Sequence, residues 1–175
     1  MRATTRLAGG LAALTAGLAL TACGVTTTAE SDAAAPPCRT ASLKWKLTLL
    51  DGTDKDGKQP NARLTALNKG PDTCVFDGYP GVEIHNGKAE TIDAAGHGHP
   101  GAVPLPGKAA ATVDIHYTPR GAKGADLYCV RQPEAVIWAP HDTDRTLVPV
   151  LDTRLKHTSI DACGESMSMA PPYRR

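Results

Sequence analysis

The sequence predicts an all-β domain, more specifically an antiparallel β-sandwich of immunoglobulin-like type with two disulfides. Apolar residues alternate with polar ones at a period of two in several segments, as they do in strands that bury one face. Turn-forming residues separate six or more such segments at spacings of about ten residues. No segment carries an apolar stripe at helical spacing. Together these observations favour two antiparallel sheets packed face to face.

Composition is consistent with one domain and argues against one class of partner. The chain has 175 residues, of which 41% are hydrophobic and only 4% aromatic, with 17 Gly and 14 Pro. We therefore expect a core made mostly of Ala, Val, Leu and Ile. Lys and Arg (19) nearly balance Asp and Glu (18), and they form no cluster along the chain. A nucleic-acid-binding protein normally carries a basic patch, so we expect no nucleic-acid partner.

The N-terminal segment, residues 1–22, resembles a bacterial lipoprotein signal peptide. Arg2 and Arg6 precede an uncharged stretch, residues 7–20, which is too short to cross about 30 Å of hydrocarbon as a helix. Small residues then precede Cys23, as in a lipobox. The resemblance implies that a diacylglyceryl group is attached to the Cys23 thiol and that cleavage makes Cys23 the first residue of the mature protein. An ordinary secretory signal followed by a chance cysteine is the alternative.

Residues 23–37 are predicted to be a lipidated flexible tether, and residues 38–175 the β-sandwich domain. The tether has almost no large apolar side chain and ends in two prolines. At about 3.3 Å per residue, residues 24–37 could hold the domain up to about 45 Å from the bilayer. Removal of the signal leaves 17 basic against 18 acidic residues, because Arg2 and Arg6 are lost. We therefore expect that the surface of an anionic membrane does not attract the domain strongly.

The first strand is predicted by strict alternation. Leu43, Trp45, Leu47 and Leu49 alternate with lysine and threonine up to a turn at Asp51. Similar patterns, separated by turn residues, predict four further strands at residues 61–67, 73–76, 82–85 and 111–117.

An Asn-Gly pair at residues 86–87 is a strong hairpin signal. A two-residue loop would place Glu83 opposite Glu90, whereas a three-residue loop places Val82 opposite Ile92. Like charges directly opposite each other are unfavourable in an antiparallel pair, so we expect the three-residue register.

Two later segments, residues 135–139 and 147–151, are apolar on both faces. Such segments indicate central strands that are covered from both sides. Pro149 lacks an amide donor and indicates an edge or a bulge in the second segment. Trp45 and Trp138 are the large side chains expected in the core.

Four cysteines remain once Cys23 is set aside, and an even number in an exported chain indicates two disulfides. Three connectivities are open. We favour the local pairing, Cys38 with Cys74 and Cys129 with Cys163, which closes two loops of similar size, each worth about 4 kcal/mol in the loop-entropy model. A four-cysteine zinc site would need close Cys-x-x-Cys pairs, which the sequence lacks.

Four segments carry a family resemblance: residues 38–40 (Cys-Arg-Thr), 74–82 (Cys-Val-Phe-Asp-Gly-Tyr-Pro-Gly-Val), 104–107 (Pro-Leu-Pro-Gly) and 163–164 (Cys-Gly). From residue 38 to the C-terminus the chain resembles the actinobacterial secreted and lipoprotein family named domain of unknown function 4232. The resemblance implies a β-sandwich with two disulfides on the outer face of the cytoplasmic membrane. It implies no established activity, ligand or cofactor. The family pattern does not explain the charged segment at residues 51–58 or the His-Gly-His sequence at residues 97–99.

Four residues are candidate copper ligands. His97 and His99 lie in a glycine-rich segment in which two imidazoles could converge. Met167 and Met169 supply thioethers, which suit cuprous copper in an exported protein. The two pairs are about seventy residues apart, so the fold could equally leave them separate, as solvated histidines and packed methionines. A copper-binding or copper-carrying protein is the alternative function.

Motifs for catalysis are missing. Residues 52–58 have the glycine and lysine spacing of a phosphate-binding loop, but Gln59 stands where Ser or Thr should contact magnesium. As a calcium loop, the same segment has Gly52 at the first ligand position and Arg63 at the twelfth, so two oxygen ligands are lacking. Gly-x-Ser-x-Gly, Ser-x-x-Lys and His-Glu-x-x-His do not occur. We expect a polar hairpin loop here and a protein that is not an enzyme and holds no cofactor.

The expected function combines these features. The protein would be a lipoprotein anchored through Cys23 at the extracytoplasmic face of the cell membrane. Its β-sandwich would bind, without catalysis, an unidentified protein or glycan of the cell envelope.

Overall fold

The computed structural model describes residues 34–51, 60–85, 91–125 and 127–175. The predicted signal peptide, Cys23, most of the predicted tether, residues 52–59 and the Asn-Gly pair at residues 86–87 lie outside these ranges. The described ranges contain twelve strands and one short 3-10 helix. No helix within them is long and apolar enough to span a membrane.

The elements follow one another in chain order as η1 Thr40–Ser42, β1 Leu43–Leu49, β2 Ala62–Asn68, β3 Cys74–Phe76, β4 Gly81–His85, β5 Thr91–Gly96, β6 Val103–Leu105, β7 Ala110–Pro119, β8 Cys129–Gln132, β9 Glu134–Trp138, β10 Thr146–Leu151, β11 Ile160–Met169 and β12 Tyr173–Arg174.

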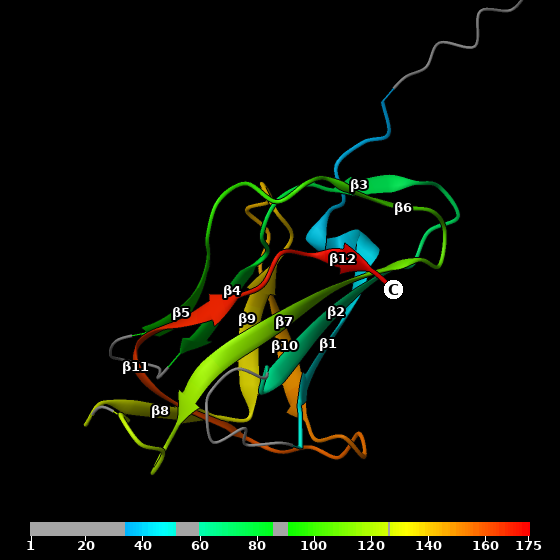
Figure 1. The fold of residues 1–175 in the computed structure, drawn as a ribbon. Coiled ribbons are helices and arrows are strands. Elements are labelled where there is room, and N and C mark those ends of the chain that lie inside the picture. The colour runs from blue at the N-terminus through cyan, green and yellow to red at the C-terminus, as the bar shows by residue number, and fades with distance from the viewer. Residues whose placement is uncertain (1–33, 52–59, 86–90, 126) are drawn as a thin grey trace, which may run out of the picture. The chain divides into compact units, whose positions relative to one another are not determined.

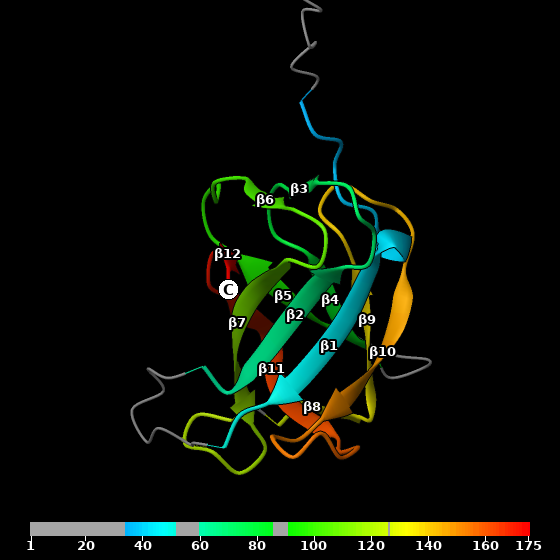
Figure 2. The same cartoon turned by 90° about the vertical axis from the view of Figure 1, so that its right-hand side faces the viewer.

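Eight of the described strands form a closed barrel (Figures 1 and 2). The order around the ring is β7, β2, β1, β10, β9, β4, β5 and β11, and β11 then pairs with β7 to close it. Strand β12 adds to β7, and β8 adds to β11. The predicted antiparallel β-sandwich is therefore wrong, because these eight strands form one closed ring and not two sheets packed face to face.

Two pairs in the ring are parallel, β1 with β10 and β5 with β11. The period-two pattern could not reveal this arrangement, since a sandwich strand and a barrel strand each bury one face. Which strands become neighbours is decided by contacts between distant segments, such as Leu47 with Val150.

The barrel interior is filled by aliphatic side chains from alternating positions, and the largest of them include Leu47, Leu64, Ile84, Ile92, Ile115, Ile137 and Ile160. A second apolar cluster surrounds Phe76, which has no exposed surface. It lies with β3 and β6, which pair with each other across one end of the barrel (Figure 2). Trp45, half-buried, packs against both clusters.

Strands β9 and β10 bury one face each. Val148 and Ala135 are cross-strand partners that point into the barrel, whereas Leu147 is 64% exposed. The prediction that these strands are covered from both sides is wrong, because a barrel strand has a single interior face. The edge position suggested by Pro149 is also wrong: β10 lies between β1 and β9, with Pro149 opposite Glu134.

Trp138 lies on the outside of the barrel and not in the core. It follows Ile137, which is fully buried, and so points the other way along the pleat. The prediction of a core tryptophan here is wrong because side-chain size alone does not say which face of a strand is buried.

The predicted register of the β4–β5 hairpin, with Val82 opposite Ile92, is also wrong. The observed register keeps two isoleucines opposite each other inside the barrel, although two carboxylates then face each other on the outside. Arg145 offsets that repulsion, since its Nη1 lies 2.7 Å from an oxygen of Glu83. The observed pairs are Glu83 with Asp93, Ile84 with Ile92 and His85 with Thr91.

Candidate functional site

The first described residues are fastened to the end of the barrel that β3 and β6 cover. The Val75 amide donates a hydrogen bond to the Pro36 carbonyl (2.8 Å), and the Cys38 amide donates one to the Val75 carbonyl (2.9 Å). Pro37 forms a β-bridge with Val75, and a disulfide joins Cys38 to Cys74. The two prolines assigned to the tether from sequence are therefore bound to β3. We call residues 36–38 the tether root.

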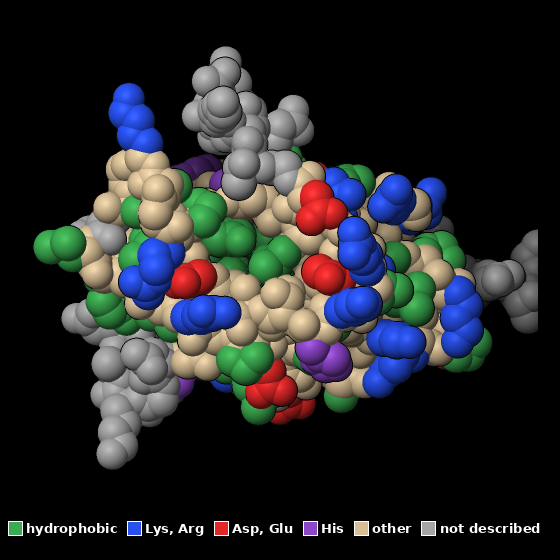
Figure 3. Space-filling view, turned by 90° about the horizontal axis from the view of Figure 1, so that it is seen from below, with side chains coloured by type: hydrophobic (Ala, Val, Ile, Leu, Met, Phe, Trp, Pro, Cys, Tyr) green, Lys and Arg blue, Asp and Glu red, His purple; other side chains and the backbone are tan. Residues whose placement is uncertain are grey.

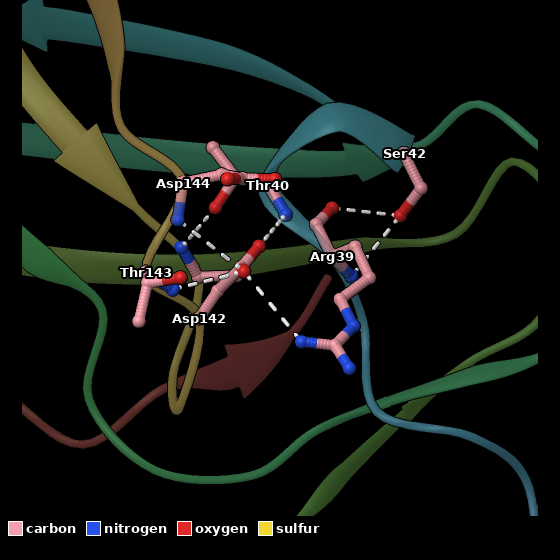
Figure 4. Close-up of polar contacts among 7 residues, drawn as sticks. Arg39, Thr40, Ser42, Asp142, Thr143 and Asp144 are labelled. Carbon is pink, nitrogen blue, oxygen red and sulfur yellow. Dashed lines mark hydrogen bonds and ion pairs between the residues drawn. The ribbon is translucent and has the colours of Figure 1, made fainter.

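A buried carboxylate holds the residues that follow the tether root (Figure 4). The Asp142 side chain is 4% exposed and accepts hydrogen bonds from the amides of Thr40 (2.7 Å) and Thr143 (2.9 Å). Arg39 Nη1 lies 3.6 Å from the same carboxylate. The hydrogen bond from the Thr40 amide is the largest of the influences that lower the pKa of Asp142 to about 2. Asp142 is therefore charged at neutral pH.

Thr40 connects this carboxylate to β1 and to the residue that follows β9. Its hydroxyl oxygen accepts a hydrogen bond from the Ala139 amide (2.9 Å), and its carbonyl accepts one from Trp45 Nε1 (3.2 Å). The hydroxyl, the carbonyl and the Asp142 oxygens all have partners within the protein. We therefore assign these residues to a structural joint between the tether root and the barrel. The sequence contained no signal for it, because Thr40 and Asp142 are 102 residues apart.

A stacked cluster on the outer face of the barrel also escaped sequence reasoning. Gly81 is opposite Trp138 in the β4–β9 pair, and a Cβ on Gly81 would lie 1.8 Å from an indole carbon. The Arg145 guanidinium carbon lies 4.3 Å from the centre of the indole ring, and the same side chain reaches Glu83. The Gly-Tyr-Pro-Gly-Val segment therefore has a packing role, since any side chain at position 81 would displace the indole.

The tyrosine of that segment positions the His-Gly-His sequence. A Cβ on Gly96 would lie 2.4 Å from the Tyr79 ring, so the ring covers the glycine closely. The Tyr79 hydroxyl donates a hydrogen bond to the His97 carbonyl (2.9 Å). The residue that follows β5 is thus held at its backbone while its imidazole is exposed.

The fold places the candidate copper ligands at one end of two paired strands but does not bring their side chains together. Strands β5 and β11 are parallel, with Met169 the partner of Gly96. Met167 and Met169 point into the core and are 2% and 5% exposed, whereas His97 and His99 are exposed. The described ranges contain no group of three or more His, Cys, Asp or Glu residues that could hold a metal ion.

The predicted disulfides are confirmed, whereas the other remaining candidates lie outside the described residues. The disulfides are Cys38–Cys74 and Cys129–Cys163, the pairing favoured from loop sizes. Cys129 and Cys163 are directly opposite each other in the β8–β11 pair. Cys23 and the phosphate-loop or calcium-loop candidates of residues 52–59 lie outside the described residues.

Comparison with known proteins identifies the family and no individual relative. Residues 38–171, which are 134 of the 175, match the family model described as Domain of unknown function (DUF4232). No match was found among the curated proteins or the solved structures. The matched range begins at the first disulfide cysteine and includes both disulfides and the Gly-Tyr-Pro-Gly-Val segment. As the resemblance of its cysteine and glycine segments predicted, the chain belongs to the DUF4232 family.

Proposed function

We propose that this protein is a lipoprotein held by acyl chains on Cys23 at the extracytoplasmic face of an actinobacterial cell membrane. The tether root carries the proposal. A disulfide and two backbone hydrogen bonds fasten the chain to β3 just after the segment that would lead to the anchor. A domain held by its N-terminal segment transmits every force from the membrane through this point. Two disulfides also favour an oxidising compartment outside the cytoplasm.

The barrel, in this proposal, binds a component of the cell envelope without catalysis. Aliphatic side chains fill the barrel interior, so a ligand would contact the outside or the ends. Asp142, the buried acidic side chain of the described residues, already accepts hydrogen bonds from backbone amides and is therefore occupied within the protein. The exposed surface is therefore the place where a protein or glycan partner would bind.

The anchor is tested by the substitution Cys23→Ser. The variant should leave the membrane fraction or accumulate with its signal peptide attached, because serine offers no thiol to accept the diacylglyceryl group. A matched control, Thr27→Ser in the predicted tether, should remain in the membrane fraction with the mass of the lipidated chain. If Cys23→Ser stays membrane-bound at the wild-type mature mass, the anchor is wrong.

The binding role is tested by chemical crosslinking in intact cells, followed by capture of the chain and identification of what is attached. We expect one envelope protein or glycan to be enriched with the wild type and to be recovered in lower yield with the Cys23→Ser chains that leave the membrane fraction. A crosslinking pattern that is the same for the wild type and for these released chains would contradict a partner located at the membrane.

A copper function has less support. Both thioethers are packed inside the barrel, so a site shared with the exposed imidazoles would require Met169 to leave the core.

A further inference from the structure

One side of the barrel presents exposed leucines among exposed cations. Strands β1 and β10 are neighbours in the ring, so their outward side chains share one face. The turn that follows β10 continues this face toward the end of the barrel away from β3 and β6 (Figure 1). We call this surface the β1–β10 strip, and its members are Lys44, Lys46, Leu147, Arg154, Leu155 and Lys156.

The register of the parallel pair sets the pattern of the strip. Continued toward the N-terminal ends of both strands, it places Lys44 beside Leu147 and Lys46 beside Pro149. Leu147 is 64% exposed, and both lysines are exposed with no ion pair to any described residue. Glu134, opposite Pro149, is the exposed acidic residue of the neighbouring strand.

The turn after β10 holds Leu155 outward in an unfavourable conformation. Asp152 Oδ1 accepts hydrogen bonds from the amides of Arg154 (2.9 Å) and Lys156 (2.8 Å), and the Leu155 amide donates to the Asp152 carbonyl (2.9 Å). Leu155 has a φ of 62° and is 60% exposed. Glycine or asparagine would occupy this left-handed region with little strain. A strained leucine in solvent contributes little to the core, so the strain points to a role for the side chain itself.

The strip lies on the side where the N-terminal segment joins the barrel. Helix η1, which follows the tether root, leads directly into β1. Figure 2 shows β1 and β10 on the same side as the incoming chain. Figure 3, which looks onto the end away from β3 and β6, shows many Lys and Arg side chains over its right half, with some acidic side chains among them. The strip therefore begins near the tether root and runs along β1 and β10 to the opposite end of the barrel. A tether of up to about 45 Å would be long enough for this side of the barrel to lie on the bilayer.

We propose that the β1–β10 strip docks the barrel on the anionic headgroups of the membrane that holds Cys23. The proposal rests on the lipid anchor proposed above. Leu147 and Leu155 would enter the headgroup layer while the lysines and arginine contact lipid phosphates, as basic surfaces with apolar residues do on anionic bilayers. The near-zero net charge does not oppose this, because the local potential depends on where the cations lie.

The test uses the lipidated wild-type chain, purified from membranes and reconstituted into vesicles. One set of vesicles contains phosphatidylcholine alone and the other also contains phosphatidylglycerol. An amine-reactive reagent then labels the lysines, and mass spectrometry reads each of them. We expect labelling of Lys44, Lys46 and Lys156 to fall about threefold or more on the anionic vesicles. Lys123, exposed in the β7–β8 connection, serves as the internal control and should not change.

Flotation of the same vesicles separates failure of the anchor from failure of docking. A chain that floats with neither vesicle contradicts the anchor. A chain that floats with both and shows equal labelling of the strip contradicts docking. Protection of the strip that appears without vesicles and grows with protein concentration assigns it to contact between copies of the chain, and this also overturns the proposal.

Two variants distinguish docking from folding. Leu155→Gly relieves the unfavourable φ, so its melting temperature should equal or exceed that of the wild type while protection of Lys156 falls. Lys44→Gln with Lys46→Gln should lose the vesicle-dependent protection of Lys156. The matched control, Arg174→Gln with Arg175→Gln, removes the same charge from exposed residues at the C-terminus and should retain it. Full protection in Leu155→Gly, or equal behaviour of the two charge variants, would show that the strip does not dock.

Discussion

One end of the barrel is covered by two strands, whereas the other end is formed by exposed connections. At the covered end, β3 and β6 cross the opening, and a second apolar cluster around Phe76 and Leu105 lies there with the Cys38–Cys74 disulfide. The β7–β8 and β10–β11 connections lie at the opposite end (Figure 1). They contain Leu127 and Leu155, which are 101% and 60% exposed.

This difference indicates that the covered end contributes to stability and that the open end is the more exposed surface. The covered end has its own buried cluster, a covalent link and the Asp142 joint, each of which is lost when that end opens. The open end exposes Leu155, a large apolar side chain that the core does not need and that the β1–β10 strip would present to the membrane. Substitutions at the covered end should therefore change stability most.

The largest effect is expected for Phe76→Ala. The ring is fully buried, so its removal leaves a cavity and should lower the free energy of unfolding by about 3 to 5 kcal/mol. Urea denaturation measures the loss. Leu127→Ala at the open end is the comparison variant and should change the value by less than about 0.5 kcal/mol. Losses of similar size at the two positions would remove the distinction between the ends.

Removal of the Cys38–Cys74 disulfide by Cys38→Ala with Cys74→Ala comes next. The sequence separation of the two cysteines is 36, and losing the link should lower the free energy of unfolding by about 2 to 4 kcal/mol. Hydrogen exchange should also become faster at the Val75 amide, which is bonded to Pro36.

The second disulfide provides the comparison, because its sequence separation of 34 gives nearly the same loop entropy. Cys129→Ala with Cys163→Ala should cost a similar free energy but leave the β8–β11 amides protected, since these strands also pair through their backbones. Equal loss of protection around both disulfides would contradict a special role for the tether root.

A smaller, pH-dependent effect is expected at Asp142. Its pKa is lowered from 3.8 to about 2 in the folded protein, so the charged form stabilises the fold. This stability is fully present above about pH 4 and is lost as the pH falls through the window from 3.8 to 2. Thermal melts should show Asp142→Asn less stable than the wild type at neutral pH, with the difference shrinking toward pH 2. A difference that is constant across this window would contradict the assignment.

The smallest effect is expected for His97→Ala with His99→Ala. Both side chains are exposed, so the free energy of unfolding should change by less than about 0.5 kcal/mol. Thermal melts with and without cuprous copper should show no copper-dependent rise in the wild type. A rise that the double substitution abolishes would favour the copper-carrier function, since a ligand that binds only the native state raises Tm.

The local elements were predictable where one face of a strand is buried. The alternation of Leu43 and Leu47 with lysines predicted β1, and that of Val113 and Ile115 with polar residues predicted β7. The predicted hairpin register is wrong because repulsion between like charges is offset by Arg145. This residue lies 62 positions from Glu83 in the sequence and contacts it in the fold. The site was less predictable still, since the Asp142 joint and the Trp138 stack unite residues from separate parts of the chain.

By itself, the sequence determined the all-β class, the approximate positions of most strands, the family and a local disulfide pairing. These depend on side-chain periodicity, turn residues and the spacing of a few cysteines, all of which are local. Only the tertiary structure decided that β1 joins β10, that β11 returns to β7 and that Trp138 faces outward. Several strands have similar hydrophobicity, so each could pair with more than one partner. The packing of the whole interior determines which strands pair and close the ring, and no single segment contains that information.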